Sequence, residues 1–145
     1  MSGFFNDAQA IVAGMSNVTG VHVTGFDATA QRPLFVTPPL TAGVKGIEIV
    51  DIVILSDTST TGSDGSNNYA FQVKDKTNTK DLLATAVNTN GNELTADTAF
   101  HITPDQENIN LGVDTVLELD ITETGTATKL ADAEIAAFVI WKFEV

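Results

Sequence analysis

The sequence has no cysteine and few basic residues. Its 145 residues include nineteen Asp and Glu against seven Lys and Arg, which gives a formal net charge of −12. The absence of cysteine excludes a disulfide framework and a thiolate metal site. The acidic charge has the wrong sign for a protein that neutralises nucleic-acid phosphates, and anionic lipid surfaces repel it. We therefore expect neither nucleic acid nor a membrane among the partners.

Long hydrophobic runs are also missing. The N-terminal stretch MSGFFNDAQAIVAGMS has no basic residue before its apolar part, and the apolar run IVAGM is too short for a secretory signal or a membrane span. We expect a soluble protein without a cleaved leader. The chain has the length of one ordinary domain, and 43% of its residues are hydrophobic, which is enough for a packed core.

Residues 1–19 differ in pattern from the rest of the chain. A polar residue, Asn6 or Asp7, precedes apolar residues at helical spacing, which predicts a short helix of marginal stability. We interpret the segment as an N-terminal arm that covers the core or docks on a neighbour, followed by a β-sandwich domain over 20–145. Large apolar side chains often dominate protein interfaces, and the arm residues predicted to form one are Phe4, Phe5, Ile11 and Val12.

From Gly20 onward, β-branched and aromatic residues form short runs between turn-forming clusters, which is typical of strands. In one run the apolar parity changes near Val50 and Asp51, which predicts a β-bulge or a strand covered on both faces. Residues 79–94 fit either a strand or a turn of helix. The predicted strands cover 20–26, 33–37, 44–57, 68–75, 98–102, 115–122 and 134–145. Without βαβ alternation, this pattern predicts an all-β fold, an antiparallel β-sandwich of jelly-roll type.

Three acids in the last third of the chain, Glu118, Asp120 and Glu123, are candidates for a catalytic carboxylate pair. A general acid needs burial to raise its pKa. Glu118 and Asp120 alternate with leucines at period two, so we interpret them as the solvent-facing side of an antiparallel strand. No G-x-S-x-G motif, cysteine nucleophile or glycine-rich phosphate loop is present. We predict no catalytic residues and a protein that is not an enzyme.

The sequence offers little for a metal or a cofactor. Its two histidines, His22 and His101, form no HxH pair of the kind that metal-binding cupins use. The loop 57–65 has oxygen-bearing side chains at alternate positions, as a calcium loop does, but Asn68 stands where a bidentate Glu is needed. We predict a polar loop, leave calcium binding open, and expect no cofactor.

The C-terminal stretch INLGVDTVLELDITETGTATKLADAEIAAFVIWKFEV, about a quarter of the chain, resembles the ends of small virion proteins of tailed bacteriophages. In those proteins a strand and a threonine-rich turn lead into a final apolar strand. The matching positions are Leu111, Gly112, Leu117, Leu119, Ile121, Thr122, Thr124, Gly125, Thr126 and Ala127. The abundance of Thr, Ala, Asn and Gly and the lack of cysteine are also similar to phage head decoration proteins.

The resemblance implies a non-enzymatic structural protein of the virion, namely a capsid decoration (cement) protein located on the capsid surface. Proteins of that family bind the outer face of the capsid lattice and stabilise contacts between capsomers. The partners that the resemblance implies are the major capsid protein and further copies of the chain itself, as a homotrimer.

A carbohydrate- or receptor-binding β-sandwich module of a phage tail is the alternative. Such a module needs exposed aromatic side chains and, in many cases, a metal loop. The only tryptophan, Trp141, shares its parity with Val139 and Phe143, so we predict that it packs in the core rather than against a sugar.

Overall fold

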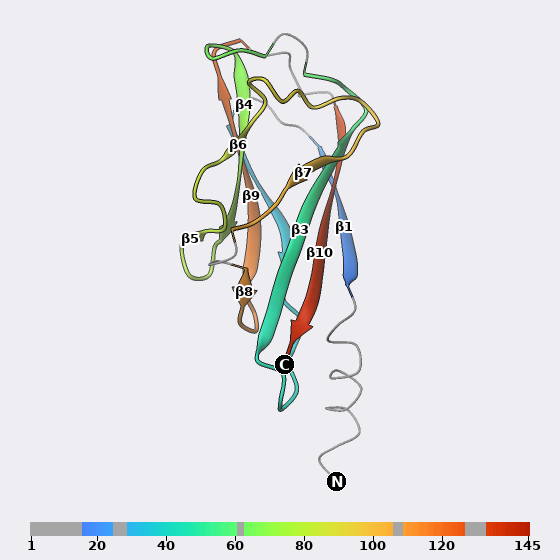
Figure 1. Cartoon of the computed structure of the whole chain (residues 1–145), viewed down its shortest axis with the longest axis vertical. Coiled ribbons are helices and arrows are strands. Elements are labelled where there is room, and N and C mark those ends of the chain that lie inside the picture. The colour runs from blue at the N-terminus through green and yellow to red at the C-terminus, as the bar shows by residue number, and fades with distance from the viewer. Residues whose placement is uncertain (1–15, 25–28, 61–62, 106–108, 127–132) are drawn as a thin grey trace.

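The computed structural model describes residues 16–24, 29–60, 63–105, 109–126 and 133–145 (Figure 1). Within these residues the chain forms ten β-strands and no helix. This part of the chain accordingly has no helix that is long and apolar enough to cross a membrane. The predicted N-terminal helix and the predicted interface residues Phe4, Phe5, Ile11 and Val12 lie outside the described residues.

Sheet A contains the first and the last strand of the described chain. Its order is β1-β10-β3-β7, and β8 also pairs with β3. The first strand begins at Asn17, so residues 17–19, which the sequence placed in the arm, are part of the sheet. The bounds of the strands are β1 Asn17–Thr24, β3 Gly46–Ser56, β7 Phe100–Ile102, β8 Asn110–Leu111 and β10 Glu134–Glu144.

Sheet B has the order β2-β9-β4-β5, and β6 also pairs with β4. The run 79–94, which fitted either strand or helix, forms only the short strands β5 and β6 with turns around them. Both sheets are antiparallel and they pack together, which confirms the predicted β-sandwich (Figure 1). Its jelly-roll type stays a prediction. The bounds are β2 Thr29–Val36, β4 Asn68–Asp75, β5 Lys80–Asp81, β6 Val87–Asn88 and β9 Val116–Thr124.

The core lies between the sheets and follows the predicted alternation. Successive side chains of a strand point to opposite faces, and every second residue is buried along β4, in most of β9 and in the first half of β10. On β9 these are Leu117, Leu119 and Ile121, on β10 Ile135, Ala137 and Val139, and on β4 Tyr69, Phe71 and Val73. Burial of each large apolar side chain contributes roughly 1.5–3 kcal/mol to folding.

The predicted β-bulge is present in β3. Asp51 is opposite Ile140 and Ile49 is opposite Trp141, so Val50 is the extra residue that has no partner on β10. A bulge shifts the side-chain alternation by one residue. Ile49 on one side of Val50 and Ile52 on the other therefore both face the core, although their parities differ.

Candidate functional site

The first candidate is the acidic pair on β9. Glu118 and Asp120 occupy the outer face of sheet B, but Glu118 is only 5% exposed, and the Lys76 ammonium donates a hydrogen bond of 2.7 Å to its Oε2. The side chain of Asp120 is 14% exposed and lies 2.6 Å from the ammonium of Lys74. The prediction that both carboxylates face water is therefore wrong for Glu118 and only partly right for Asp120, because β9 lies inside the sheet with β2 and β4 on either side.

The electrostatics of this pair are those of structural ion pairs. The hydrogen bond to Asp120 and the attraction of its charge raise the pKa of Lys74 above its ordinary value. The third acid, Glu123, is opposite Tyr69 and has the parity of the core-facing leucines, so it does not share a face with the other two. Among the described residues, these acids form two lysine–carboxylate pairs rather than a carboxylate dyad.

The histidines give no metal centre in the described chain. His101 Nδ1 lies 2.6 Å from Asp51 Oδ2, and the Thr103 hydroxyl donates to Asp51 Oδ1 at 3.1 Å. His22 is in β1, where its backbone is opposite Ala136. No group of three or more His, Asp or Glu side chains within the described ranges has an arrangement that would hold a metal ion.

The loop with calcium-like spacing uses its described carboxylates to fix its own backbone. Asp64 Oδ1 accepts hydrogen bonds from the amides of Ser66 at 2.7 Å and Asn67 at 2.8 Å, and these two bonds lower the pKa of Asp64. Asp57 Oδ1 accepts a bond from the amide of Glu134 at 3.1 Å. In the described part of the loop, Asp64 thus fixes the turn that follows it, and Asp57 bonds the loop to the start of β10. Residues 61 and 62 of the loop lie outside the described chain.

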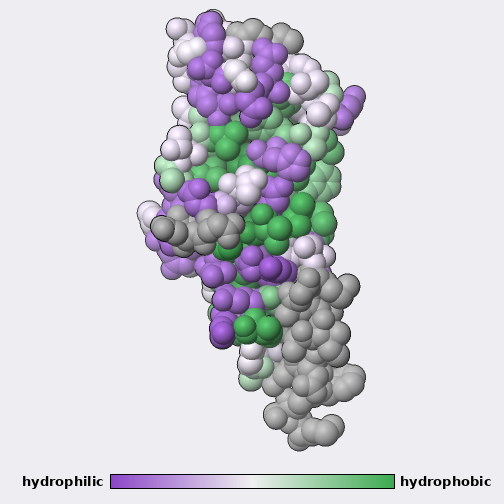
Figure 2. Space-filling view, in the orientation of Figure 1, coloured by the Kyte–Doolittle hydropathy of each residue, from purple (hydrophilic) through white to green (hydrophobic). Residues whose placement is uncertain are grey.

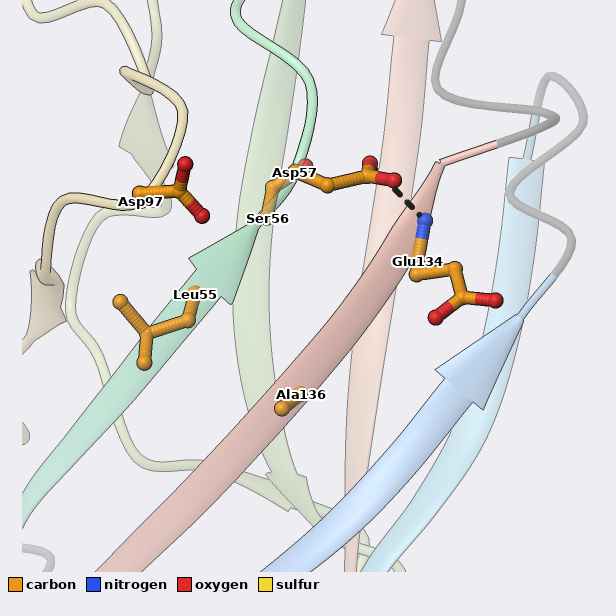
Figure 3. A pocket seen from close by; sticks show the side chains of 6 residues that line it. All are labelled: Leu55, Ser56, Asp57, Asp97, Glu134 and Ala136. Atoms are coloured by element: carbon orange, nitrogen blue, oxygen red, sulfur yellow. Dashed lines mark hydrogen bonds between the residues drawn. The ribbon is translucent and has the colours of Figure 1, made fainter.

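A hollow of about 340 Å³ lies where β3 and β10 meet at the end of sheet A. Figure 3 shows its acidic residues, Asp57, Asp97 and Glu134, with the bond from the Glu134 amide to the Asp57 carboxylate. Leu55 and Ala136 line the same hollow, and they are opposite each other in the register of the two strands. The hollow therefore continues the outer surface of the sheet between these strands.

That outer surface combines an apolar part with polar residues of the same strands: Asp51 is opposite Ile140, and His101 of β7 is opposite Val53. Val53 is opposite Phe138, and Ile140 is opposite Val18 on β1. Figure 2 shows hydrophobic residues gathered over β3 and β10. Val18 is 63% exposed, and the other members are half-buried. We call this surface the sheet A face and define it as Val18, Val53, Leu55, Phe138 and Ile140.

The signal for this face is present in the sequence, although the sequence-based prediction missed the face. The runs 44–57 and 134–145 have apolar residues on both parities, which is typical of a strand covered on both sides. Phe138 and Ile140 have the parity opposite to Val139 and Trp141. Among the strands that the structure describes, none packs on the outer side of β3 and β10, and the outer side chains of these strands remain partly exposed.

A second apolar surface is a groove between the edge strands of the two sheets. It has a volume of about 550 Å³ and is formed by β1, β2, the segment after β2 and one residue of β10. Trp141 packs against Phe35 and Phe143 at ring-centre distances of 5.6 and 5.2 Å, and its Nε1 donates to the Thr19 hydroxyl at 3.1 Å. The prediction that it packs in the core is right in part, because Trp141 contacts the core but is only partly buried. The residues lining the groove are Thr19, Gly20, Val21, Pro33, Leu34, Phe35, Val36, Pro38 and Trp141.

Comparison with known proteins adds no assignment to these surfaces. A scan of protein-family models and a search of curated proteins found no match to this chain. Function is therefore inferred from the sheet A face, the groove and the resemblance of the C-terminal stretch.

Proposed function

We propose that this chain is a non-enzymatic structural protein of a tailed-phage virion, a capsid decoration protein that binds the outer capsid surface and stabilises contacts between capsomers. The proposed partners are the major capsid protein and further copies of the chain, as a homotrimer. The observation that supports this proposal most strongly is the apolar sheet A face.

The two outer faces of the sandwich differ in chemistry. The outer face of an antiparallel sheet commonly meets water and is polar, and sheet B fits this rule, with Gln72 and Lys74 beside the acids of β9. The sheet A face instead has Phe138, Ile140 and their apolar neighbours. Contiguous exposed apolar surface on a soluble protein marks an interaction site. We assign this face to the shell and the charged face of sheet B to solvent.

The strand order also favours the proposal. The outermost strands in the described chain, β1 and β10, pair with each other, as do β2 and β9 next to them, each pair in its own sheet. Nested pairing of this kind results when a long hairpin folds over itself. For this reason we propose that the sandwich is a jelly roll. Jelly rolls include viral capsid domains as well as lectins and cupins. A fold alone does not define a function, so the face remains the main support.

Sedimentation with capsid shells tests the proposal. Shells of the phage that encodes this chain, assembled without it, are mixed with the wild-type protein and pelleted. We expect the wild-type protein to co-sediment, and a Phe138→Gln, Ile140→Gln variant to bind at least about tenfold more weakly, since each apolar contact contributes about 25 cal/mol per Å² before entropic costs.

The matched control is Val113→Gln, which changes an apolar residue that is 50% exposed in the turn before β9. It should bind like the wild type. Urea unfolding of all three proteins verifies that the sandwich is intact. A wild-type protein that stays in the supernatant, or a face variant that binds as well as Val113→Gln, contradicts the proposal.

The alternative, a carbohydrate- or receptor-binding module of a phage tail, is favoured by one observation. Trp141 lines an open groove, and tryptophan offers a ring face to a sugar. A glycan array with and without calcium separates the two functions. Glycan binding that quenches the fluorescence of Trp141 would favour the tail module over the decoration protein.

A further inference from the structure

The groove lies where the sandwich is open at its side. Among the described strands, β1 is the edge strand of sheet A and β2 is the edge strand of sheet B, so each has a strand neighbour on one side only. Edge strands of this kind accept an added chain segment, with backbone bonds for affinity and side-chain pockets for specificity. Val36 lines the groove and is 58% exposed. The groove therefore combines an apolar lining with two strand edges.

The chain itself contains a segment that suits this lining. Residues 1–16 include only one charged side chain, Asp7, and they include Phe4, Phe5, Ile11 and Val12. The remaining chain has eighteen of the nineteen acids and all seven Lys and Arg, a formal charge of 7 − 18 = −11. Two bodies of that charge repel each other. A nearly neutral, apolar segment is the part of one copy that approaches another copy at the lowest electrostatic cost.

The geometry of β1 favours a second copy as the source of that segment. Asn17, the first residue of β1, is opposite Trp141 at the edge of the groove, and the groove continues along Thr19 and Val21. A segment that precedes Asn17 must reverse its direction to run beside Thr19 and Val21 of its own chain. Fifteen extended residues span up to about 50 Å, which is sufficient to reach a neighbouring protein.

We infer that the groove between β1 and β2 binds residues 4–12 of a second copy of this chain, with Phe4 and Phe5 as the apolar anchors. One copy's segment in the next copy's groove is a head-to-tail contact, which closes into a ring when the rotation permits. The inference rests on the proposed function, which predicts a homotrimer. It identifies the contact that would join the copies in such a ring. The groove also borders the sheet A face, because Val18 of that face precedes Thr19 in β1.

Disulfide trapping tests this inference, because the natural chain has no cysteine. Full-length Asn6→Cys and Val36→Cys proteins are prepared separately, mixed in equal amounts at low concentration and mildly oxidised. Each chain then has a single thiol, so a bond between the arm and the groove joins two copies. We expect the yield of the cross-linked peptide pair to be at least about tenfold higher than from a control mixture of Asn6→Cys with Val113→Cys. Val113 is a suitable control position because its exposure is similar to that of Val36.

Equal yields from the two mixtures would overturn the inference. So would a double Asn6→Cys, Val36→Cys chain that gives only a monomeric intrachain disulfide, since the segment would then occupy the groove of its own chain.

Static light scattering gives an independent readout. A Phe4→Ser, Phe5→Ser variant should shift to a smaller species, with red-shifted emission from Trp141, the only tryptophan. The control, Ala8→Ser with Ala10→Ser, should keep the wild-type mass, and a Phe4→Ser, Phe5→Ser variant of wild-type mass would refute the inference. Wild-type protein that co-sediments with shells but gives no specific cross-link would refute this inference alone, whereas a specific cross-link without shell binding would refute the proposed function alone.

Discussion

Gly125 offers the sharpest test of how the end of β9 packs on the loop before β4. Its φ is +66°, and a Cβ built on it would overlap the carbonyl oxygen of Ser66 and lie 2.7 Å from Asn67 Oδ1. An L-residue in the left-handed region costs roughly 1–2 kcal/mol. The overlap adds to this cost because the nearest atom belongs to the backbone, so the loop itself must move.

Movement of the loop before β4 would break several hydrogen bonds. The amides of Ser66 and Asn67 donate to Asp64 Oδ1, and the amide of Thr126 donates to Asn67 Oδ1 at 2.9 Å. These bonds weaken when the loop moves, which adds to the cost of the substitution. We therefore expect Gly125→Ala to lower the free energy of unfolding by more than the roughly 1–2 kcal/mol that the backbone conformation alone costs, measured from the urea midpoint at constant slope.

Two other glycines separate the cost of the backbone conformation from the cost of the overlap with the loop. Gly91 has a φ of +74° with no atom within 4 Å of the position that a Cβ would occupy, and Gly112 has no such neighbour and no positive φ. Gly91→Ala should cost about 1 kcal/mol, and Gly112→Ala should lie within about 0.5 kcal/mol of the wild type. If Gly125→Ala and Gly91→Ala are equally destabilising, the packing of β9 on the loop is refuted.

Two further predictions concern the carboxylates. Glu118→Ala should lower the free energy of unfolding by about 1–2 kcal/mol in urea titrations, because a buried acceptor of a charged hydrogen bond is lost while Lys76, 60% exposed, remains solvated. The control, Glu123→Ala, should change the free energy of unfolding by less than about 0.5 kcal/mol. Equal effects of the two substitutions would contradict the burial of Glu118. The two amide bonds that depress the pKa of Asp64 stabilise the fold above the ordinary carboxyl pKa of about 3.9, and this stabilisation is lost as the pH falls through the lower value of the folded state. Urea midpoints at pH 5 and pH 3 should therefore differ more for the wild type than for Asp64→Asn, and identical differences would count against these bonds.

Local periodicity predicted the core and the bulge. Leu117, Leu119 and Ile121 are buried because alternation at period two decides which face a side chain occupies. The change of apolar parity at Val50 is a local signal of the extra residue, and in the structure Val50 has no partner on β10. Both predictions depend only on neighbours within one strand, so the sequence was sufficient for them.

Burial depth and the groove depend on distant parts of the chain. Parity placed Glu118 on the outer face, but its burial depends on β2 and β4, which lie on either side of β9. The groove joins Thr19 and Phe35, from the first two strands of the described chain, with Trp141 from the last strand. No local pattern encodes such a juxtaposition, which explains why the sequence predicted the packing of Trp141 and not the surface that it lines.

The charges at the margin of the sheet A face bear on its proposed role as a binding surface of an acidic protein. Glu48 lies 3.1 Å from the ammonium of Lys142, and Asp51 lies beside His101. Glu48 and Asp51 therefore have partners on the surface of the same sheet, whereas Asp57, Asp97 and Glu134 line the hollow at its end. A partner that contacts Phe138 and Ile140 meets the Glu48–Lys142 ion pair and a carboxylate that already has hydrogen-bond partners, so the hydrophobic gain is opposed by less repulsion there than beside the acidic hollow. Reversing one of these pairs, as in Lys142→Glu, would place unpaired acids beside Ile140 and should weaken association more at low salt than at high salt.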